Sequence, residues 1–239
     1  MPIAVLMPVY NAPPALGPTL EGVRALAASL GGVTVLLVDD GSDPPVDPSS
    51  LPSPSASFQI VLARHALNLG QGAALETARQ LALRQGDFSA YVTMDADGQH
   101  RPQDLPALVE AITGGADVAF GNRFLGDSNV PAARRAVLRA ARLFERALTG
   151  LSLADAHNGF RAFSRRAIAG LHLRQNRMAH ATEIKQQIAR ASAERPLVVV
   201  EVPVSVRYSQ ATLEAGQSSL GAFTILRDLF HRYLFEGPE

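Results

Sequence analysis

The segment Asp95-Ala96-Asp97-Gly98-Gln99-His100 places three oxygen donors within five residues, directly after an apolar run. On an extended strand, residues two apart project to the same side, so Asp95 and Asp97 can direct two carboxylates at one point while Gln99 adds a carbonyl oxygen. A hard divalent cation such as Mg²⁺ or Mn²⁺ prefers these ligands and keeps open positions for substrate phosphates. The pattern therefore indicates half of a metal site. The alternative is a polar turn that caps the helix after it.

The composition bounds the class of protein. The chain has 239 residues, of which 47% are hydrophobic, and this favours one domain with one sizeable core. Lys and Arg together number 22, as do Asp and Glu, so no net positive charge attracts nucleic acid, and nucleic acid is not expected as a partner. The chain has no cysteine, which excludes disulfides and thiolate metal sites.

The two ends of the chain and its hydropathy bear on location. The apolar N-terminal run is interrupted by Pro8 and has no basic segment before it, so it indicates a strand and not a signal peptide. No stretch approaches the roughly 20 apolar residues of a spanning helix. We expect a cytoplasmic protein, or one peripheral at the inner face of the cell membrane.

Short apolar runs alternate with helix-length segments as far as about residue 120. Strands without polar alternation are buried on both faces, which predicts an α/β fold: a three-layer α/β/α sandwich with a mainly parallel central sheet. Segment 43–57, dense in Pro and Ser, is expected to be an irregular surface loop. The predicted strands are Ile3–Met7, Val33–Val38, Phe58–Ala63, Ala90–Met94 and Val118–Phe120. In the second half we expect helices over 130–150, 179–192 and 220–235, and strands over 158–164 and 197–208.

Each predicted strand of the first half ends in hydrogen-bonding residues, and in a parallel sheet these ends form one crevice. Tyr10 offers an aromatic face for a nucleobase, while Asp39 or Asp40 can accept a base N–H or ribose hydroxyls, unless they only form the turn. The guanidinium group of Arg123 can donate two parallel hydrogen bonds to phosphate oxygens. The alternative is that Arg123 only forms a surface ion pair. The strand-end segments are Pro8-Val9-Tyr10-Asn11, Asp39-Asp40-Gly41-Ser42, Asn68–Gly72, Asp95–His100 and Gly121-Asn122-Arg123.

Two glycines precede the predicted helix 73–84, so backbone amides can approach a ligand closely there. Gly70 and Gly72 form two thirds of a dinucleotide fingerprint, which supports a nicotinamide-dependent oxidoreductase as an alternative. The third glycine is missing, and the pair follows the third strand instead of the first.

Two further residues in the second half can act on a substrate. Glu183 lies in the opening turn of the predicted helix 179–192, where it is either a catalytic base or a favourable first-turn charge. Arg207 lies at the end of the predicted strand 197–208, where it could close over phosphates from the other side.

The five strand-end motifs, in this order and spacing, resemble those of the family 2 glycosyltransferases of the GT-A fold. Asn158-Gly159-Phe160-Arg161-Ala162 and Pro203-Val204-x-Val206-Arg207-Tyr208 resemble the polyprenyl-phosphate sugar transferase branch, related to dolichol-phosphate mannose synthase. The resemblance implies a GT-A catalytic domain over 1–210, with a nucleotide-sugar-binding half at about 1–125, an acceptor half at about 126–210, and an amphipathic helix over 211–239.

The resemblance also implies a function: inverting transfer of a hexose from a nucleotide-diphosphate sugar, UDP-sugar first and GDP-mannose second, to a polyprenyl-phosphate or glycan acceptor. Tyr10 and Asp40 would hold the nucleoside, and Arg123 and Arg207 would stabilise the diphosphate with Mg²⁺ or Mn²⁺. Glu183 would be a base for a hydroxyl acceptor, or orient substrate if the acceptor is a phosphate. The donor-binding set implied is Pro8, Tyr10, Asn11, Asp39, Asp40, Gly70, Gly72, Asp95, Ala96, Arg123 and Arg207.

Two departures from the family pattern stand out. Many lipid-phosphate enzymes carry Glu where this chain has Ala12, and some members end in transmembrane helices that this chain lacks. The C-terminal amphipathic helix is suited to a membrane surface, or to packing on the domain or on a second subunit as a homodimer. The non-enzymatic alternative is a nucleotide-sugar binding protein that has lost its acceptor half.

Overall fold

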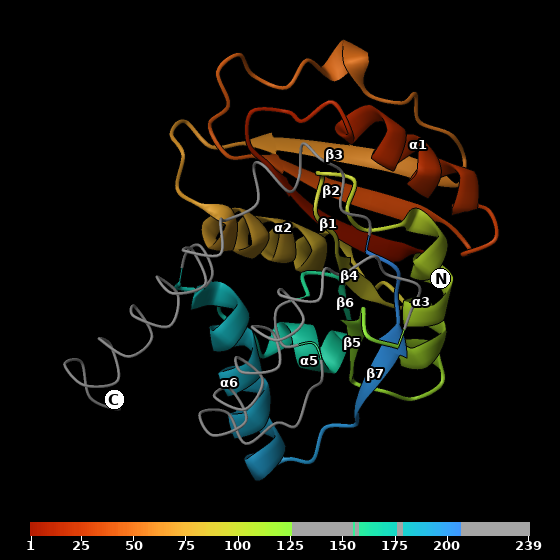
Figure 1. Ribbon diagram of the computed structural model, residues 1–239, viewed down its shortest axis with the longest axis vertical. Coiled ribbons are helices and arrows are strands. Elements are labelled where there is room, and N and C mark those ends of the chain that lie inside the picture. The colour runs from red at the N-terminus through yellow and green to blue at the C-terminus, as the bar shows by residue number, and fades with distance from the viewer. Residues whose placement is uncertain (126–154, 156–157, 176–178, 207–239) are drawn as a thin grey trace.

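The computed structural model describes residues 1–125, 155, 158–175 and 179–206. Helices and strands alternate through most of that span (Figure 1). In chain order the elements are β1 (Ile3–Val9), α1 (Leu16–Leu26), β2 (Val33–Asp39), the 3₁₀ turn η1 (Pro48–Ser50), β3 (Phe58–Arg64), α2 (Gln71–Gln85), β4 (Tyr91–Thr93), η2 (Pro102–Asp104), α3 (Leu105–Thr113), β5 (Val118–Asn122), β6 (Arg161–Phe163), α5 (Arg165–Ala169), α6 (Ala179–Glu194) and β7 (Val199–Pro203).

One sheet of seven strands runs through the molecule in the order β3-β2-β1-β4-β6-β5-β7 (Figure 1). β1 pairs in parallel with β2 and β4, β2 with β3, and β5 with β7. β6 is antiparallel to both of its neighbours, β4 and β5. The mainly parallel α/β architecture predicted from the uninterrupted apolar runs is confirmed.

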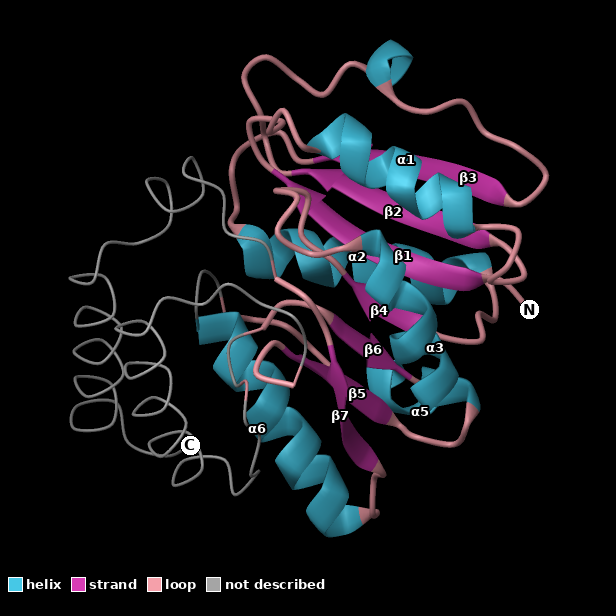
Figure 2. Cartoon of the chain, turned by 45° about the vertical axis from the view of Figure 1, so that its right-hand side comes forward, coloured by secondary structure: helices cyan, strands magenta, loops and turns pink. Residues whose placement is uncertain are grey.

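Helices cover both faces of the sheet, as strands buried on both sides require. Alternate residues of β1 point to opposite faces, so Ile3, Val5 and Met7 join a core with α1 and α3, whereas Ala4 and Leu6 join a core with α2, α5 and α6. Figure 2 shows α1 and α3 together on one side of the sheet. The predicted three layers are therefore present.

The structure corrects several element boundaries. The strand predicted over 158–164 is confined to β6, and a short helix, α5, follows it. β7 ends at Pro203, and Val206 makes an isolated antiparallel bridge to His100 instead of extending the strand. The 43–57 loop is irregular as expected, apart from η1. The helices predicted over 130–150 and 220–235, and the C-terminal unit 211–239, lie outside the described residues.

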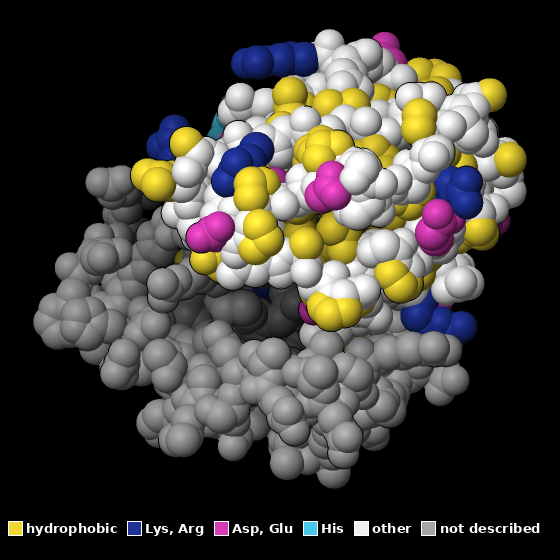
Figure 3. Space-filling model, turned by 90° about the horizontal axis from the view of Figure 1, so that it is seen from above, with side chains coloured by type: hydrophobic (Ala, Val, Ile, Leu, Met, Phe, Trp, Pro, Cys, Tyr) yellow, Lys and Arg dark blue, Asp and Glu magenta, His cyan; other side chains and the backbone are white. Residues whose placement is uncertain are grey.

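The surface of the described part carries mixed charge. Seen from above, acidic and basic side chains lie singly among hydrophobic and other polar groups, without a continuous basic patch (Figure 3). Among the residues that the structure describes, no helix is both long and apolar enough to cross a bilayer.

Candidate active site

The register of the sheet brings the strand ends level. Val9 of β1 pairs with Asp39 of β2, and Asp39 pairs with Arg64 of β3, so the three segments that follow these strands leave the sheet together. β4 lies on the other side of β1, where Leu6 pairs with Thr93, and the Asp95–His100 segment leaves the sheet beside them. The predicted gathering of polar strand ends at one edge follows from this pairing.

The end of β1 presents an aromatic side chain to solvent. Tyr10 is 52% exposed, whereas Pro8 is buried inside the strand. Asn11 adopts a positive φ of 48° and is tied to the end of β2: its backbone N–H donates to Ser42 Oγ at 2.9 Å, and its Oδ1 accepts the backbone N–H of Asp43 at 3.2 Å. This turn fixes the position from which Tyr10 projects.

Asp39 is buried and organises the loop after β2. Its Oδ1 accepts the backbone N–H of Ser42 at 2.9 Å, and its Oδ2 accepts that of Val46 at 3.1 Å. Burial acts to raise the pKa of Asp39, but the hydrogen bonds from Ser42 and Val46, with the charge of Arg64, outweigh burial and hold the pKa below its ordinary value. The carboxylate is thus ionised, and both of its oxygens accept backbone N–H groups of the loop after β2.

Asp40 is buried as well, and it holds the loop that leads to α2. Its oxygens accept the backbone N–H groups of Leu69 at 3.0 Å and Gly70 at 2.7 Å, and Oδ1 lies 2.7 Å from His65 Nδ1. The loop also lies directly on Gly41 (φ 74°), where a Cβ would approach the carbonyl carbon of Leu67 to 2.4 Å. Both aspartates therefore hold the loops around Tyr10, and a contact from either of them to a nucleoside stays a prediction.

The start of α2 is joined to the acidic segment. Gly70 caps the helix with a φ of 94° and no side-chain cap, and Gly72 is buried in its first turn. The exposed side chain of Gln71 donates from Nε2 to Asp95 Oδ1 at 2.9 Å. Sequence reasoning missed Gln71, since nothing in the chain links it to a carboxylate 24 residues later.

Asp97 lies at the centre of the acidic segment and is largely buried. Its Oδ1 accepts the backbone N–H of Gln99 and its Oδ2 accepts Gln99 Nε2, both at 2.9 Å. Burial raises the pKa of Asp97, and the neighbouring carboxylate of Asp95 adds to the rise. Two carboxylates are thus held close together in a partly desolvated place, beside the buried Ala96.

His100 and Gly159 contact Asp95 and restrict its position. The His100 ring stacks on Phe160 with centroids 4.9 Å apart, and its Nδ1 accepts the backbone N–H of Asp95 at 3.1 Å. A Cβ at Gly159 would lie 2.7 Å from Asp95 Oδ2, so only glycine leaves the carboxylate room. His100 is therefore a support for Asp95 with one ring nitrogen already engaged.

The donor set fits a divalent cation. Within the described residues, neither Asp95 nor Asp97 forms an ion pair with Lys or Arg, and burial together with the charge of Asp95 raises the pKa of Asp97. The described part of the chain offers no cluster of three or more His, Cys, Asp or Glu side chains. A cation at Asp95, Asp97 and Gln99 would take its remaining ligands from water or substrate, as Mg²⁺ commonly does.

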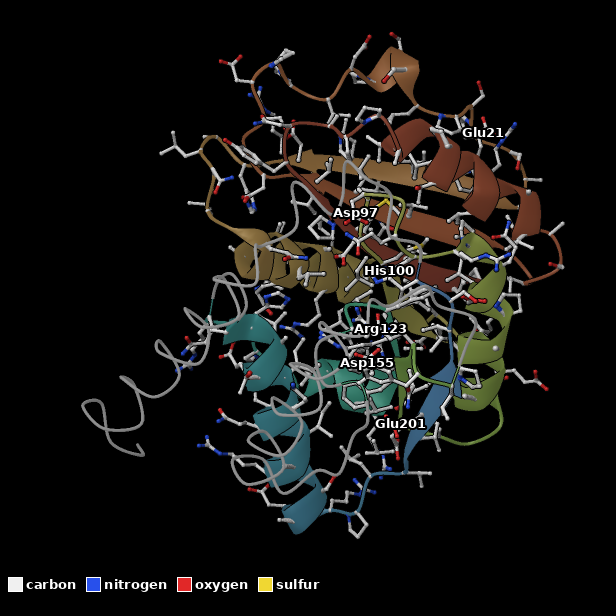
Figure 4. The ribbon with its side chains drawn as sticks, in the orientation of Figure 1. Glu21, Asp97, His100, Arg123, Asp155 and Glu201 are labelled. Carbon is white, nitrogen blue, oxygen red and sulfur yellow. The ribbon has the colours of Figure 1, made fainter. Side chains whose placement is uncertain are left out.

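Arg123 is ion-paired, and the pair is buried instead of lying on the surface. Its Nε donates to Asp155 Oδ2 at 2.6 Å, and its backbone N–H donates to the same oxygen at 2.9 Å. Figure 4 shows Asp97, His100, Arg123 and Asp155 following one another along the sheet, with Glu201 beyond them. Asp155 escaped sequence reasoning because it belongs to no apolar run and precedes the motif at 158–162 by three residues.

Glu183 is engaged by the backbone. As predicted, it lies in the first turns of a helix, α6. Its carboxylate accepts the N–H of Arg174 at 3.0 Å and that of Gln175 at 2.9 Å, so it holds the segment that precedes the helix. Arg207 lies outside the described residues.

Comparison with known proteins agrees with this arrangement. The model of glycosyl transferase family 2 matches residues 4–171. An uncharacterized protein of Methanocaldococcus jannaschii is 28% identical over 239 residues, covering 98% of this chain and 93% of the relative. A polyprenol monophosphomannose synthase of Mycolicibacterium smegmatis is 31% identical over 176 residues, covering 71% of this chain and 64% of the relative. This chain thus spans slightly under two thirds of that synthase.

Solved structures share the fold. Glucosyl-3-phosphoglycerate synthase of Mycobacterium tuberculosis, solved with Mn²⁺, uridine diphosphate and phosphoglyceric acid, superposes with a TM-score of 0.58 at 18% identity, covering 89% of this chain and 73% of that one. At this identity the likeness shows the GT-A fold alone. The family match covers well over half of the sequence and includes all five strand-end motifs together with Asp155 and Gly159. The chain therefore belongs to the family 2 glycosyltransferases.

Proposed function

We propose that this protein is a metal-dependent, inverting glycosyltransferase. It moves a hexose from a nucleotide-diphosphate sugar to polyprenyl phosphate, with a UDP-sugar as first choice of donor and GDP-mannose as second, in the synthesis of cell-envelope polysaccharide or glycolipid. The observation that carries the proposal is the Asp95–Asp97 pair: two carboxylates without a Lys or Arg ion pair among the described residues, at the edge where the strand ends meet. The relatives named for polyprenol and dolichol phosphate support the acceptor.

Each part of the edge has a role in binding the donor. Tyr10 stacks on the nucleobase, in a frame set by Pro8, Asn11, Asp39 and Asp40. The backbone at Gly70 and Gly72 lies against the donor phosphates, and Arg123 and Arg207 stabilise them. Asp95, Asp97 and Gln99, beside Ala96, hold Mg²⁺ or Mn²⁺, which when bound neutralises charge that develops on the departing diphosphate.

The transfer itself needs little proton chemistry. A lone pair on the acceptor phosphate oxygen forms the bond to the anomeric carbon, while the bond from that carbon to the diphosphate oxygen breaks and its electron pair leaves with the diphosphate. Attack from the opposite face inverts the configuration. An anionic acceptor has no proton to lose, which agrees with a Glu183 carboxylate that already accepts two backbone N–H groups.

The location follows from the acceptor. Because polyprenyl phosphate is a membrane lipid, we place the reaction at the inner face of the membrane, with peripheral contact through the amphipathic helix that the sequence predicts over 211–239. A glycan acceptor and a homodimer are the alternatives for the same second half of the chain.

The test combines donor binding with transfer. Calorimetry with UDP, GDP and dTDP in Mn²⁺ identifies the nucleotide, and transfer to polyprenyl phosphate is measured with and without EDTA. We expect binding and transfer to require the metal and the product anomer to be inverted by NMR. Transfer indifferent to EDTA and to Asp97→Ala would overturn the metal role, and tight nucleotide binding with no turnover on any acceptor would favour a non-catalytic binding protein.

A further inference from the structure

The carboxylate of Asp155 accepts two hydrogen bonds from Arg123. Its Oδ2 accepts both the backbone N–H and the side-chain Nε–H of Arg123, and it also accepts Asn158 Nδ2 at 3.2 Å. Asp155 is 2% exposed and Arg123 8% exposed. Anchoring the backbone and the guanidinium of Arg123 to the same oxygen restricts the torsions between them, so the side chain is held in one direction.

Stability is a poor explanation for this pair. Removing two charges from water costs several kcal/mol per ion, and a buried ion pair is often no more stable than apolar side chains of similar volume. The second oxygen of Asp155, Oδ1, is buried without a hydrogen bond in the described structure, which adds to that cost. A charge kept under these conditions is better explained by what it does to Arg123.

The segment that holds Arg123 also touches the metal-binding carboxylate. Thr93 of β4, Arg161 of β6 and Phe120 of β5 lie level across the sheet. Asp95 follows β4 and Asn122 ends β5, and Gly159 precedes β6, the strand that lies between these two. The close approach of Gly159 to Asp95 Oδ2, and the bond from Gly121 N–H to the Phe160 carbonyl at 2.9 Å, place the segment between them.

We propose that Asp155 is a positioning residue that fixes the guanidinium of Arg123 for the departing diphosphate, and that residues 158–161 set the distance between Arg123 and the cation site at Asp95. The proposal rests on the proposed function, because it assigns the arginine a diphosphate to stabilise. Charge held in place before the reaction stabilises the transition state without reorganisation at that moment, which is the advantage of a fixed guanidinium over a mobile one.

The chain contains a matched control for the test. Asp117 forms an ion pair with the exposed Arg166 at the opposite end of β5, next to the first residue of the strand, and like Asp155 it also accepts a backbone N–H. Asp155→Asn keeps an oxygen that can accept a hydrogen bond but removes the charge. We expect kcat for sugar transfer to fall about 100-fold, as for a misplacement of about 1 Å, with the KM for the donor within about twofold. Asp117→Asn is expected to lower the melting temperature and leave kcat unchanged.

A double substitution separates positioning from a general loss of fold. If Asp155 acts through Arg123, then Asp155→Asn adds less than about a twofold loss of kcat in an Arg123→Lys background. A folded Asp155→Asn variant with wild-type kcat would overturn the proposal. So would a full multiplication of the two single losses in the double variant.

A spectroscopic readout tests the geometry apart from the activity. In ¹⁵N NMR of the full chain, the Nε–H of Arg123, assigned by its loss in Arg123→Lys, is expected to exchange slowly in the wild type and rapidly in Asp155→Asn. Absence of a protected signal in the wild type would overturn the positioning role and leave the proposed function standing. A protected signal in a wild type that transfers no sugar would instead overturn the proposed function, and the positioning role with it.

Discussion

The substitution Asp97→Asn distinguishes the metal site from the fold. It is expected to raise the stability of the protein without metal and to remove the stabilisation that added metal gives. Burial and the charge of Asp95 raise the pKa of Asp97, so without metal the folded protein binds the Asp97 proton more tightly than the unfolded chain does. A group with a raised folded pKa contributes its stability below the unfolded pKa, near 3.8, and loses it as the pH rises through the folded value. At pH 7 the wild type therefore carries the cost of an ionised Asp97, which the asparagine variant avoids.

Added metal is expected to make the wild type more stable than Asp97→Asn. A ligand that binds only the folded state at 100 times its dissociation constant stabilises that state by about 2.7 kcal/mol. For a chain of this length, 1 kcal/mol corresponds to about 2 to 4 °C in melting temperature. Mn²⁺ is thus expected to raise the melting temperature of the wild type by about 5 to 11 °C and to leave Asp97→Asn unchanged.

Thermal unfolding at pH 7, in EDTA and in Mn²⁺, measures both effects. Asp87→Asn is the control, since Asp87 is an exposed carboxylate paired with the exposed Arg165. This variant is expected to keep the full response to Mn²⁺. The reasoning fails if Mn²⁺ stabilises Asp97→Asn as strongly as the wild type, or if Asp97→Asn unfolds at a lower temperature than the wild type in EDTA at pH 7.

Three further outcomes are expected. In Gly159→Ala the new Cβ displaces the Asp95 carboxylate, so the initial rate of transfer falls about 10- to 100-fold; an unchanged rate in the folded variant contradicts the close approach. Asp39→Asn lowers the free energy of unfolding in urea by about 2 kcal/mol at pH 7, and because the Asp39 pKa is lowered, this difference disappears as the pH falls below the lowered value. A difference that persists in acid argues against an ionised Asp39. Glu183→Gln retains most of the transfer rate, since an amide oxygen still accepts a backbone N–H; complete loss in the folded variant would restore the base role.

Much of the site's location was predictable because it depends on short-range patterns. Apolar runs predict the strands, and parallel strands present their carboxyl ends at one edge. These rules require no knowledge of which strands are neighbours. The two-residue strand period expected for Asp95 and Asp97 does not apply, because β4 ends at Thr93 and Asp97 lies in a turn. The donor and cation site at this edge stays a prediction.

The contacts of each polar group were not predictable, since they depend on long-range pairing. Asp40 is plainly an acceptor in the sequence, but its donors come from residues 29 and 30 positions later. Asp155, one partner of Arg123, is 32 residues away in the chain and precedes β6, which lies beside β5. Residue type alone suggested a nucleoside contact at Asp40 and a phosphate contact at Arg123, but it could not predict the loop contacts of Asp40 or the buried pair of Arg123 with Asp155.

The antiparallel strand β6 also constrains the order in which the chain can assemble. The strands β1 to β4 pair among themselves and are complete by residue 93, so they can form a sheet while the rest of the chain is still being synthesised. β5 follows soon after, but both of its neighbours in the described sheet, β6 and β7, come later in the chain. The half of the sheet that carries Arg123 must therefore wait for residues 161–163, and the two halves of the active site are completed at different times during folding.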